Sequence, residues 1–485
     1  MNTEPGILIG WASEDITPYG KKVNLYGQFG MRVTSKVKDP VTATALSISQ
    51  GKSDENVLIF VSCDICTVPV PLFNKVTKII AGESADFPIG KLVVNATHTH
   101  TAPDYKAGIY DYSAIAEDDK KDIMMPEEYE TFLAEKIAAS AIRSWRSRKK
   151  GMIAWGFGQA VVGHNRRSVY LKDFSDRPDY KETPGQKVEK NGRMYGNTND
   201  PFISHIEGFE DHSVQFLFTF DMEKKLTGAV INIACPSQET GNISEISADF
   251  WHDTREALRK EYGENLFVLP QCSAAGDQSP SLLLNKKAEK RMREFKGVDS
   301  RQEIASRIKT AFDETLKWTS MDIRDNAVIK HVSIEVPLPK RLVTEEEYKK
   351  NLGWLGTLDQ KMFQDRCQEV IKRYEEQRND PFIPEEIHVV RVGDIVFTSN
   401  SFELFLDYGI RIQAQSPAVQ TFIIQLAGSR CGSDRGGTYL STERAQNGGG
   451  YSACVYCNLV GHEGGQVLVK ETLKTIDELF QERSE

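Results

Sequence analysis

The sequence has few cysteines, no long apolar run and no excess of positive charge, and each absence excludes a class of protein. Its 485 residues include 8 cysteines, too few for a fold held together by disulfides. No stretch approaches the roughly 18 consecutive apolar residues of a spanning helix, so we expect no membrane span. The net charge of −9 argues against nucleic acid and anionic membranes as partners, because both attract basic patches.

The first ten residues contain neither the basic start nor the apolar core of a secretory signal peptide. On this ground we expect a cytoplasmic protein, or a periplasmic or secreted one if an export signal has been removed. We find no internal repeat, low-complexity stretch or clear linker. The sequence therefore predicts one large domain over residues 1–485, long enough for a substantial core.

Two cysteine pairs, Cys63/Cys66 and Cys454/Cys457, have the C-x-x-C spacing that zinc ligands often show. Together they could make a four-cysteine zinc site. Cys63 and Cys66, however, belong to an apolar, strand-like run, in which cysteine is often only a small apolar residue. We therefore expect Cys63 and Cys66 to be small apolar residues of a strand and not zinc ligands.

Apolar runs that read as strands alternate with amphipathic stretches that read as helices, and this order predicts an α/β fold with mixed β-sheets flanked by helices. Residues 173–200 are polar and aperiodic, and they predict a surface insertion of the kind that forms lids or substrate loops. We expect helices at 71–81, 126–149, 251–262, within 344–377 and at 464–482, strands at 7–12, 43–49, 56–62, 92–94, 213–220, 226–234 and 266–270, and a hairpin across 387–399.

The segment that organises the prediction runs from Leu92 to Pro103. A short apolar strand there passes into a polar stretch that contains His98 and His100. If the extended conformation continues, residues two apart point to the same face. Two neighbouring imidazoles suit a metal ligand beside a general base, or a metal that is ligated twice.

Four further segments carry candidate chemistry. The turn Gly276-Asp-Gln-Ser279 follows a predicted strand, and Ser279 is either an incidental turn residue or a nucleophile or hydrogen-bond donor. Cys235 lies where a strand meets Pro236, and it is either buried filler or a metal ligand. Glu403 lies among apolar residues, where a carboxylate is costly unless it is paired or bound to metal. Tyr439 and Tyr451 lie in a glycine-rich loop that could pack close to a ligand.

Together these segments resemble the catalytic domain of the neutral/alkaline ceramidase family. The blocks that carry the resemblance are Asn95-Ala-Thr-His-Thr-His-Thr-Ala-Pro, Gly276-Asp-Gln-Ser-Pro and Tyr439-Leu-Ser-Thr-Glu. The resemblance implies a zinc-dependent hydrolase that cuts the amide bond between a fatty acid and a sphingoid base. By motif, it implies zinc ligands at His98, Glu403 and Tyr439, a histidine facing water and substrate at His100, an essential serine at Ser279, an oxyanion-facing tyrosine at Tyr451 and a substrate-contacting arginine at Arg166.

The sequence departs from the family pattern in three ways. Spacing places Cys235 where the family has its second zinc histidine, so the site could be His/Cys/Glu/Tyr, with His252 or His212 as alternative sources of the imidazole. The chain stops where the family's C-terminal β-sandwich domain would begin. The polar residues 173–200 have no obvious counterpart, and they favour a substrate more polar than ceramide.

The sequence thus predicts a Zn²⁺-dependent hydrolase of an amide bond in a small acylated molecule, such as ceramide or an N-acyl sugar or amino-acid conjugate. Two other interpretations stay open. Ser279 could be the covalent nucleophile of an amidase or esterase with His100 as its base. The chain could also be a binding protein that kept the fold and lost the metal.

Overall fold

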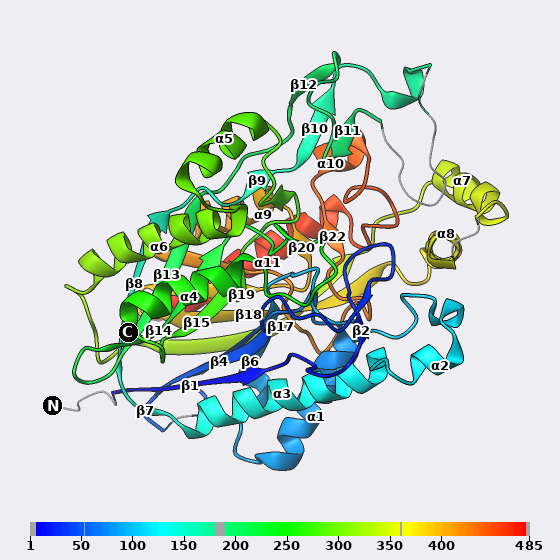
Figure 1. The fold of residues 1–485 in the computed structure, drawn as a ribbon. Helices are drawn as coiled ribbons and strands as arrows, with labels where there is room; N and C mark the ends of the chain where they lie inside the picture. The colour runs from blue at the N-terminus through cyan, green and yellow to red at the C-terminus, as the bar shows by residue number, and fades with distance from the viewer. Residues whose placement is uncertain (1–5, 53, 179, 181–189, 359–360, 482–485) are drawn as a thin grey trace.

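The computed structural model describes residues 6–52, 54–178, 180, 190–358 and 361–481. It contains several β-sheets flanked by helices, as the sequence predicted (Figure 1). No helix among these residues combines the length and the apolar character needed to cross a bilayer.

The N-terminal sheet has five strands in the order β6-β5-β4-β1-β7. Its apolar strands are the predicted ones, and β5 and β6 run parallel while the other pairs are antiparallel. Helices α1 (Val70–Glu83) and α3 (Pro126–Arg146) pack together below this sheet in Figure 1. The strands are β1 (Ile7–Asp15), β4 (Thr42–Gln50), β5 (Val57–Cys63), β6 (Leu92–Ala96) and β7 (Lys149–Lys150).

Two four-stranded sheets complete the frame. One has the order β15-β14-β13-β8 and is covered by α4 (Phe250–Tyr262) and α6 (Ser300–Thr319), while the other has the order β17-β18-β19-β21 and packs against α11 (His462–Gln481). Each contains one parallel pair, β14 with β15 and β19 with β21. Their strands are β8 (Met152–Gln159), β13 (Ser213–Phe220), β14 (Leu226–Ile233), β15 (Phe267–Cys272), β17 (Ile329–Pro339), β18 (Phe382–Val392), β19 (Ile395–Ser399) and β21 (Gln420–Ile424).

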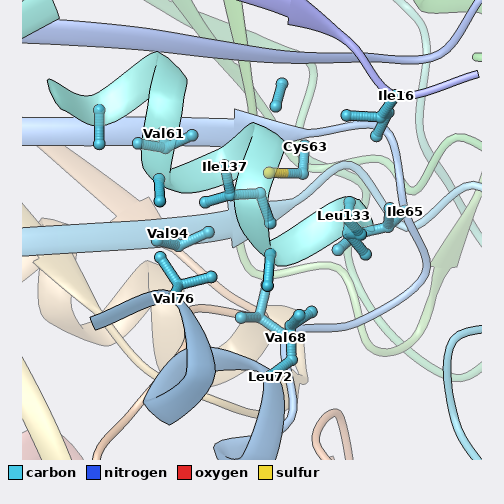
Figure 2. Packing of buried hydrophobic residues seen from close by; sticks show 14 of the residues in the cluster. Ile16, Val61, Cys63, Ile65, Val68, Leu72, Val76, Val94, Leu133 and Ile137 are labelled. Carbon is cyan, nitrogen blue, oxygen red and sulfur yellow. The ribbon is translucent and has the colours of Figure 1, made fainter. Parts of the chain in front are cut away.

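The hydrophobic core explains why the three sheets stay together. One apolar cluster contains inward side chains from all three sheets, among them Phe60, Leu217 and Phe397. Each sheet also packs a second cluster against its own helices. Figure 2 shows this outer layer for the N-terminal sheet, where Cys63 lies in the same cluster as Ile137 of α3. Strands buried on both faces account for the nearly continuous apolar runs of the sequence.

Several predicted elements differ in detail. The helix expected to reach residue 149 ends at Arg146, because Lys149 joins β1 through the short strand β7. The helical stretch 344–377 is two helices, α7 (Glu345–Leu355) and α8 (Lys361–Glu376). The hairpin across 387–399 is confirmed, with Gly393 at φ 59° in its turn.

The polar segment 173–200 contains the short strand β11 (Gly192–Met194), which pairs with β10 (Arg167–Tyr170); residues 179 and 181–189 of this prediction lie outside the described part. The remaining elements are β2 (Val23–Asn24), β3 (Val33–Thr34), β9 (His164–Asn165), β12 (Ile203–Ile206), β16 (Gln278–Ser279), β20 (Glu403–Leu404), β22 (Tyr439–Leu440), α2 (Glu117–Lys120), α5 (Lys286–Lys296), α9 (Leu406–Gln415), α10 (Glu443–Gly448), η1 (Ile89–Lys91), η2 (Tyr112–Ala114) and η3 (Phe174–Asp176).

Candidate active site

The candidate site lies where the carboxyl ends of the parallel strands of all three sheets meet. The segments that follow β5, β6, β14, β15 and β19 carry Cys66, His98, Gln238, Gly276 and Glu403 respectively. Open α/β folds bind ligands beyond the carboxyl ends of their strands. The topology therefore brings together side chains that are far apart in the sequence.

His98 holds an unusual backbone conformation. Strand β6 ends at Ala96, so the extended conformation does not continue to His98, which instead has φ 65°. A non-glycine residue in this region is uncommon and marks a site where the surroundings fix the backbone. The His98 and His100 rings still lie close, with centroids 5.0 Å apart. They meet because of this turn, not because of strand alternation.

The two nitrogens of His98 have different partners. Nδ1 donates to the backbone oxygen of Cys66 at 2.6 Å, which leaves Nε2 facing Oε2 of Glu403 at 3.1 Å. Both side chains are buried. Burial alone would lower the pKa of His98, but the nearby Glu403 carboxylate outweighs it and raises that pKa well above its ordinary value. The arrangement therefore favours a positive charge at Nε2, whether a proton or a metal ion.

Glu403 and Tyr439 are register partners in the short parallel pair of β20 and β22. Gly276 approaches this pair so closely that a Cβ at this position would lie 2.3 Å from the backbone oxygen of Glu403. Only glycine allows such an approach. The glycine of the predicted turn therefore sets the position of the carboxylate.

Arg166 is a buried cation at the centre of the site. Its NH2 group donates to the oxygen of Gly276 at 2.9 Å and to the hydroxyl of Tyr439 at 3.3 Å, and it lies 3.7 Å from Glu403. Its NH1 group donates to the hydroxyl of Tyr195 at 3.2 Å. These contacts fix the guanidinium beside the carboxylate.

His100 is held in the neutral form. Burial, followed by the positive charges of His98, Arg166 and Arg32, lowers its pKa well below the ordinary value. The side-chain amide of Gln238 donates to Nε2 of His100 at 2.9 Å. A neutral imidazole can accept a proton, as a general base must.

Ser279 is buried next to the same arginine. Its Oγ accepts hydrogen bonds from the hydroxyl of Tyr195 at 3.1 Å and from the backbone N–H of Ser281 at 3.0 Å. Among the hydrogen bonds of the described residues, His100 pairs with Gln238 and Gln28 and not with Ser279. The serine–histidine pair of a nucleophilic serine enzyme is therefore not formed in this structure.

A cavity of about 270 Å³ opens onto part of this site, and neither Arg166 nor Ser279 is among its lining residues. Its lining includes His98, His100 and Glu403, together with Tyr439 and Tyr451, whose ring centroids lie 5.6 Å apart. Burial, as the largest cause, raises the pKa of both phenols, so both stay protonated at neutral pH. A protonated phenol can donate a hydrogen bond to a developing oxyanion.

Cys235 is not brought to this cluster. Its thiol lies near the backbone oxygens of Val162 and Pro236, and burial raises its pKa well above the ordinary value. The thiol that lies beside the site histidines is that of Cys66, 3.7 Å from Nδ1 of His98. Ligand atoms of Cys66, His98 and His100 lie within 4.8 Å of one another.

The other candidate ligands of the sequence lie elsewhere. His212 forms a separate cluster with His164 and Glu210, and His252 belongs to neither His/Cys/Asp/Glu cluster found among the described residues. The thiols of Cys454 and Cys457 lie 3.4 Å apart, and neither joins Cys63 or Cys66 in a cluster. The four-cysteine zinc site is therefore not assembled in the described part of the chain.

Comparison with solved structures shows the fold of this chain. No family model matches the sequence, and no curated protein matches it significantly. Among solved structures, neutral ceramidase from Pseudomonas aeruginosa matches with a TM-score of 0.67 over 98% of this chain and 75% of that chain, at 16% identity. A structure described as ceramidase complexed with C2 matches with a TM-score of 0.67 over 99% of this chain and 76% of that chain, at 14% identity. The chain has the neutral ceramidase fold.

In this ceramidase fold, the donor set around His98 fits a zinc ion. Imidazole, thiolate and carboxylate are the ligands that zinc prefers. The hydrogen bond from Nδ1 of His98 to a carbonyl is the outer-shell contact that orients a ligating histidine. The separation of 3.1 Å between Nε2 and the Glu403 oxygen is close to the roughly 3.3 Å edge of a tetrahedron with bonds of about 2.0 Å.

Three residues of the site were missed from the sequence. Gln238 lies five residues beyond β14 in an ordinary polar loop, and Tyr195 follows β11 within the polar segment. Neither has a local signal that separates it from a surface residue. Cys66 did have a local signal, because it lies three residues beyond the apolar strand β5. Its C-x-x-C spacing with Cys63, however, suggested cysteine partners and not histidine.

Proposed function

We propose that this protein is a zinc-dependent hydrolase of the amide bond in N-acyl compounds. The observation that carries the proposal is the buried pair of His98 and Glu403, which faces a cavity at the strand ends of a ceramidase fold. Three functional groups surround this pair: the neutral imidazole of His100, the protonated phenol of Tyr451 and the fixed guanidinium of Arg166. This set suits acyl transfer to water.

His98, Glu403 and Tyr439 would hold the zinc, and Cys66 would complete the ligand set in place of the predicted Cys235. When bound, zinc would polarise the scissile carbonyl and lower the pKa of water toward about 7.

The chain's own residues supply the remaining steps. His100 is neutral, so its Nε2 can exchange the hydrogen bond from Gln238 for a proton from the attacking water and return that proton to the amine that leaves. Tyr451 keeps its proton and can donate to the carbonyl oxygen as negative charge develops there. Arg166 holds Tyr439 and the Gly276 turn in place through its hydrogen bonds. Arg166 would also contact the substrate, and Ser279 accepts the hydrogen bond of the Tyr195 hydroxyl.

The cavity walls favour a substrate with an anionic or strongly polar half. Lys106 and Arg366 both line the cavity. Burial, followed by the charge of Arg435, lowers the pKa of Lys106 to about 8, so most of its population is still charged at pH 7. Arg366 lies 4.9 Å from the ring centroid of Tyr456, and its NH1 group is buried without a hydrogen-bond acceptor. A substrate carboxylate would satisfy this group, as in an N-acyl amino acid.

Metal content tests the first part of the proposal. We expect His98→Ala and Glu403→Ala each to bind one equivalent of zinc fewer than wild type, measured by elemental mass spectrometry. Both variants should also lose the ability to hydrolyse acyl amides. Cys66→Ala should lose zinc as well, His100→Ala should keep zinc and lose turnover, and Cys235→Ala should retain wild-type zinc. Retention of zinc and turnover in His98→Ala would contradict the assignment. Wild-type protein that takes up no zinc and turns over no substrate would favour the binding-protein interpretation.

A matched pair of substrates tests the polar half. We expect Arg366→Gln to raise KM about tenfold for an N-acyl amino acid, the loss of one charged hydrogen bond, and to leave KM for a neutral N-acyl ethanolamine unchanged. Arg378→Gln serves as the control, because it removes an exposed arginine just beyond α8, the helix that contains Arg366. An equal effect of Arg366→Gln on both substrates would exclude a carboxylate contact.

A further inference from the structure

A second group of metal-ligating side chains lies outside the candidate active site. It consists of His164 in β9 and of Glu210 and His212 in the segment before β13, and one ligand atom from each lies within 4.8 Å of the others. Nδ1 of His164 is 3.1 Å from Oε2 of Glu210, and Nε2 of His212 is 3.3 Å from the same oxygen. The three groups therefore converge on one point.

The hydrogen bonding of this cluster is incomplete. Oε1 of Glu210 accepts from the backbone N–H of Asn165 at 3.2 Å, which turns Oε2 toward both imidazoles. Nε2 of His212 is buried, yet it makes no hydrogen bond. A buried nitrogen without a partner is costly. A metal ion bound to this nitrogen would supply the missing partner.

The spacing and the chemistry agree with one kind of ion. The separations of 3.1 and 3.3 Å match the roughly 3.3 Å edge of a tetrahedron whose bonds are about 2.0 Å long. Two imidazoles and one carboxylate are a known zinc ligand set with one open position. Calcium and magnesium bind through oxygen and do not suit two nitrogen donors. We propose that His164, Glu210 and His212 form a second zinc site.

The site would stabilise the segment that positions the candidate active site. His164 is the register partner of Ser279, and the backbone N–H of Arg166 donates to the oxygen of Asp277 at 2.9 Å. A metal bound here ties residues 210–212 to β9, and through β9 to the ribbon that carries Arg166 and Ser279. Its role is positioning, so the site stands apart from the active-site zinc in both ligands and effect.

Zinc stoichiometry and thermal stability of the full-length protein test the inference. We expect His212→Ala and Glu210→Gln each to bind one zinc fewer than wild type and to show a rise in Tm with saturating zinc that is smaller than in the wild type by a few degrees. His205→Ala removes an exposed histidine of the nearby β12 and should match wild type in both measurements. Using two variants guards against the failure of either one to fold.

The outcomes separate this site from the active site. One zinc that is lost in His98→Ala and kept in both His212→Ala and Glu210→Gln would overturn the second site and leave the proposed hydrolase intact. One zinc with the opposite dependence would support the second site and contradict the active-site metal. Cobalt(II) titration followed by visible absorption gives an independent count, since each tetrahedral site adds its own band intensity.

Discussion

Burial controls the protonation of single carboxyl groups in this molecule, and Glu385 is a clear example. It lies in β18, and both of its oxygens accept hydrogen bonds from Ser401, from the backbone N–H and from the hydroxyl, each at 2.7 Å. Burial raises its pKa to about 7, against about 4.3 in an unfolded chain. Glu385 therefore stabilises the fold fully below pH 4, and this contribution is lost as the pH rises through about 7.

Glu385→Gln should remove this pH dependence, because the amide cannot ionise. We expect the variant to be more stable than wild type at pH 8 by about 3 to 4 kcal/mol, and the two proteins to differ by only about 1 kcal/mol at pH 5. Urea unfolding at the two pH values measures the difference. The same difference at pH 5 and pH 8 would show that Glu385 stays ionised in the folded protein.

At the level of single residues, the sequence predicted those that lie in distinctive local patterns. His98, Glu403 and Tyr439 stand at strand ends or among apolar neighbours, and the structure places them in one cavity. Gln238 and Tyr195 could not be predicted, because their partners, His100 and Arg166, are distant in sequence. Cys235 and Cys66 both follow apolar strands, and only packing decides which thiol faces the histidines.

Among the elements, the polar segment beyond residue 173 contributes a side chain to the candidate site. It supplies Tyr195, whose hydroxyl contacts NH1 of Arg166 at 3.2 Å and Oγ of Ser279 at 3.1 Å. The aromatic ring also lies 5.6 Å from the guanidinium carbon. A segment predicted as a lid or substrate loop therefore takes part in holding the arginine.

Tyr195→Phe removes the hydroxyl and keeps the ring. We expect kcat/KM for the acyl amide to fall about tenfold, the effect of one hydrogen bond worth about 1.4 kcal/mol, with an unchanged circular dichroism spectrum. Tyr19→Phe alters a tyrosine that is 60% exposed and should have wild-type kinetics. Wild-type kcat/KM in Tyr195→Phe would mean that the other partners of Arg166 are sufficient to position it.

The predictability of the elements follows from their burial. Strands such as β4, β5 and β13 are buried over nearly their whole length, and they were found with small errors in their bounds. Helices α7 and α8 share one charged pattern, and nothing in the periodicity marks the break between them. The short strands β9 and β16 have two residues each, too few for any pattern to emerge.

For the whole molecule, the order in which the sheets pack could not be predicted, since each strand reads as buried whichever sheet contains it.

One buried ion pair joins two of the sheet layers. Asp64, just beyond β5, accepts two hydrogen bonds from Arg255 of α4 at 2.8 and 3.0 Å, and both side chains are almost fully buried. Breaking such a pair leaves a buried charge without compensation.

Asp64→Asn should therefore lower the free energy of unfolding by about 3 to 5 kcal/mol, measured by urea unfolding at pH 7. The double variant Asp64→Leu/Arg255→Met removes both charges and should recover most of this loss, because an apolar pair does not need compensation. A double variant as unstable as Asp64→Asn would place the stability in the hydrogen bond from Thr42 to Asp64 instead of in the ion pair.

The division of the site among three sheets has a kinetic consequence. His98 follows a strand of the N-terminal sheet, Gln238 follows a strand of the second sheet, and Glu403 follows a strand of the third. No single sheet carries both His98 and Glu403, the two side chains that would bind the metal ion. During refolding, the candidate active site is therefore completed only when the layers dock, after the secondary structure of each layer has formed. The rate of metal binding at His98 during refolding would therefore report the last step of assembly, the docking of the sheets.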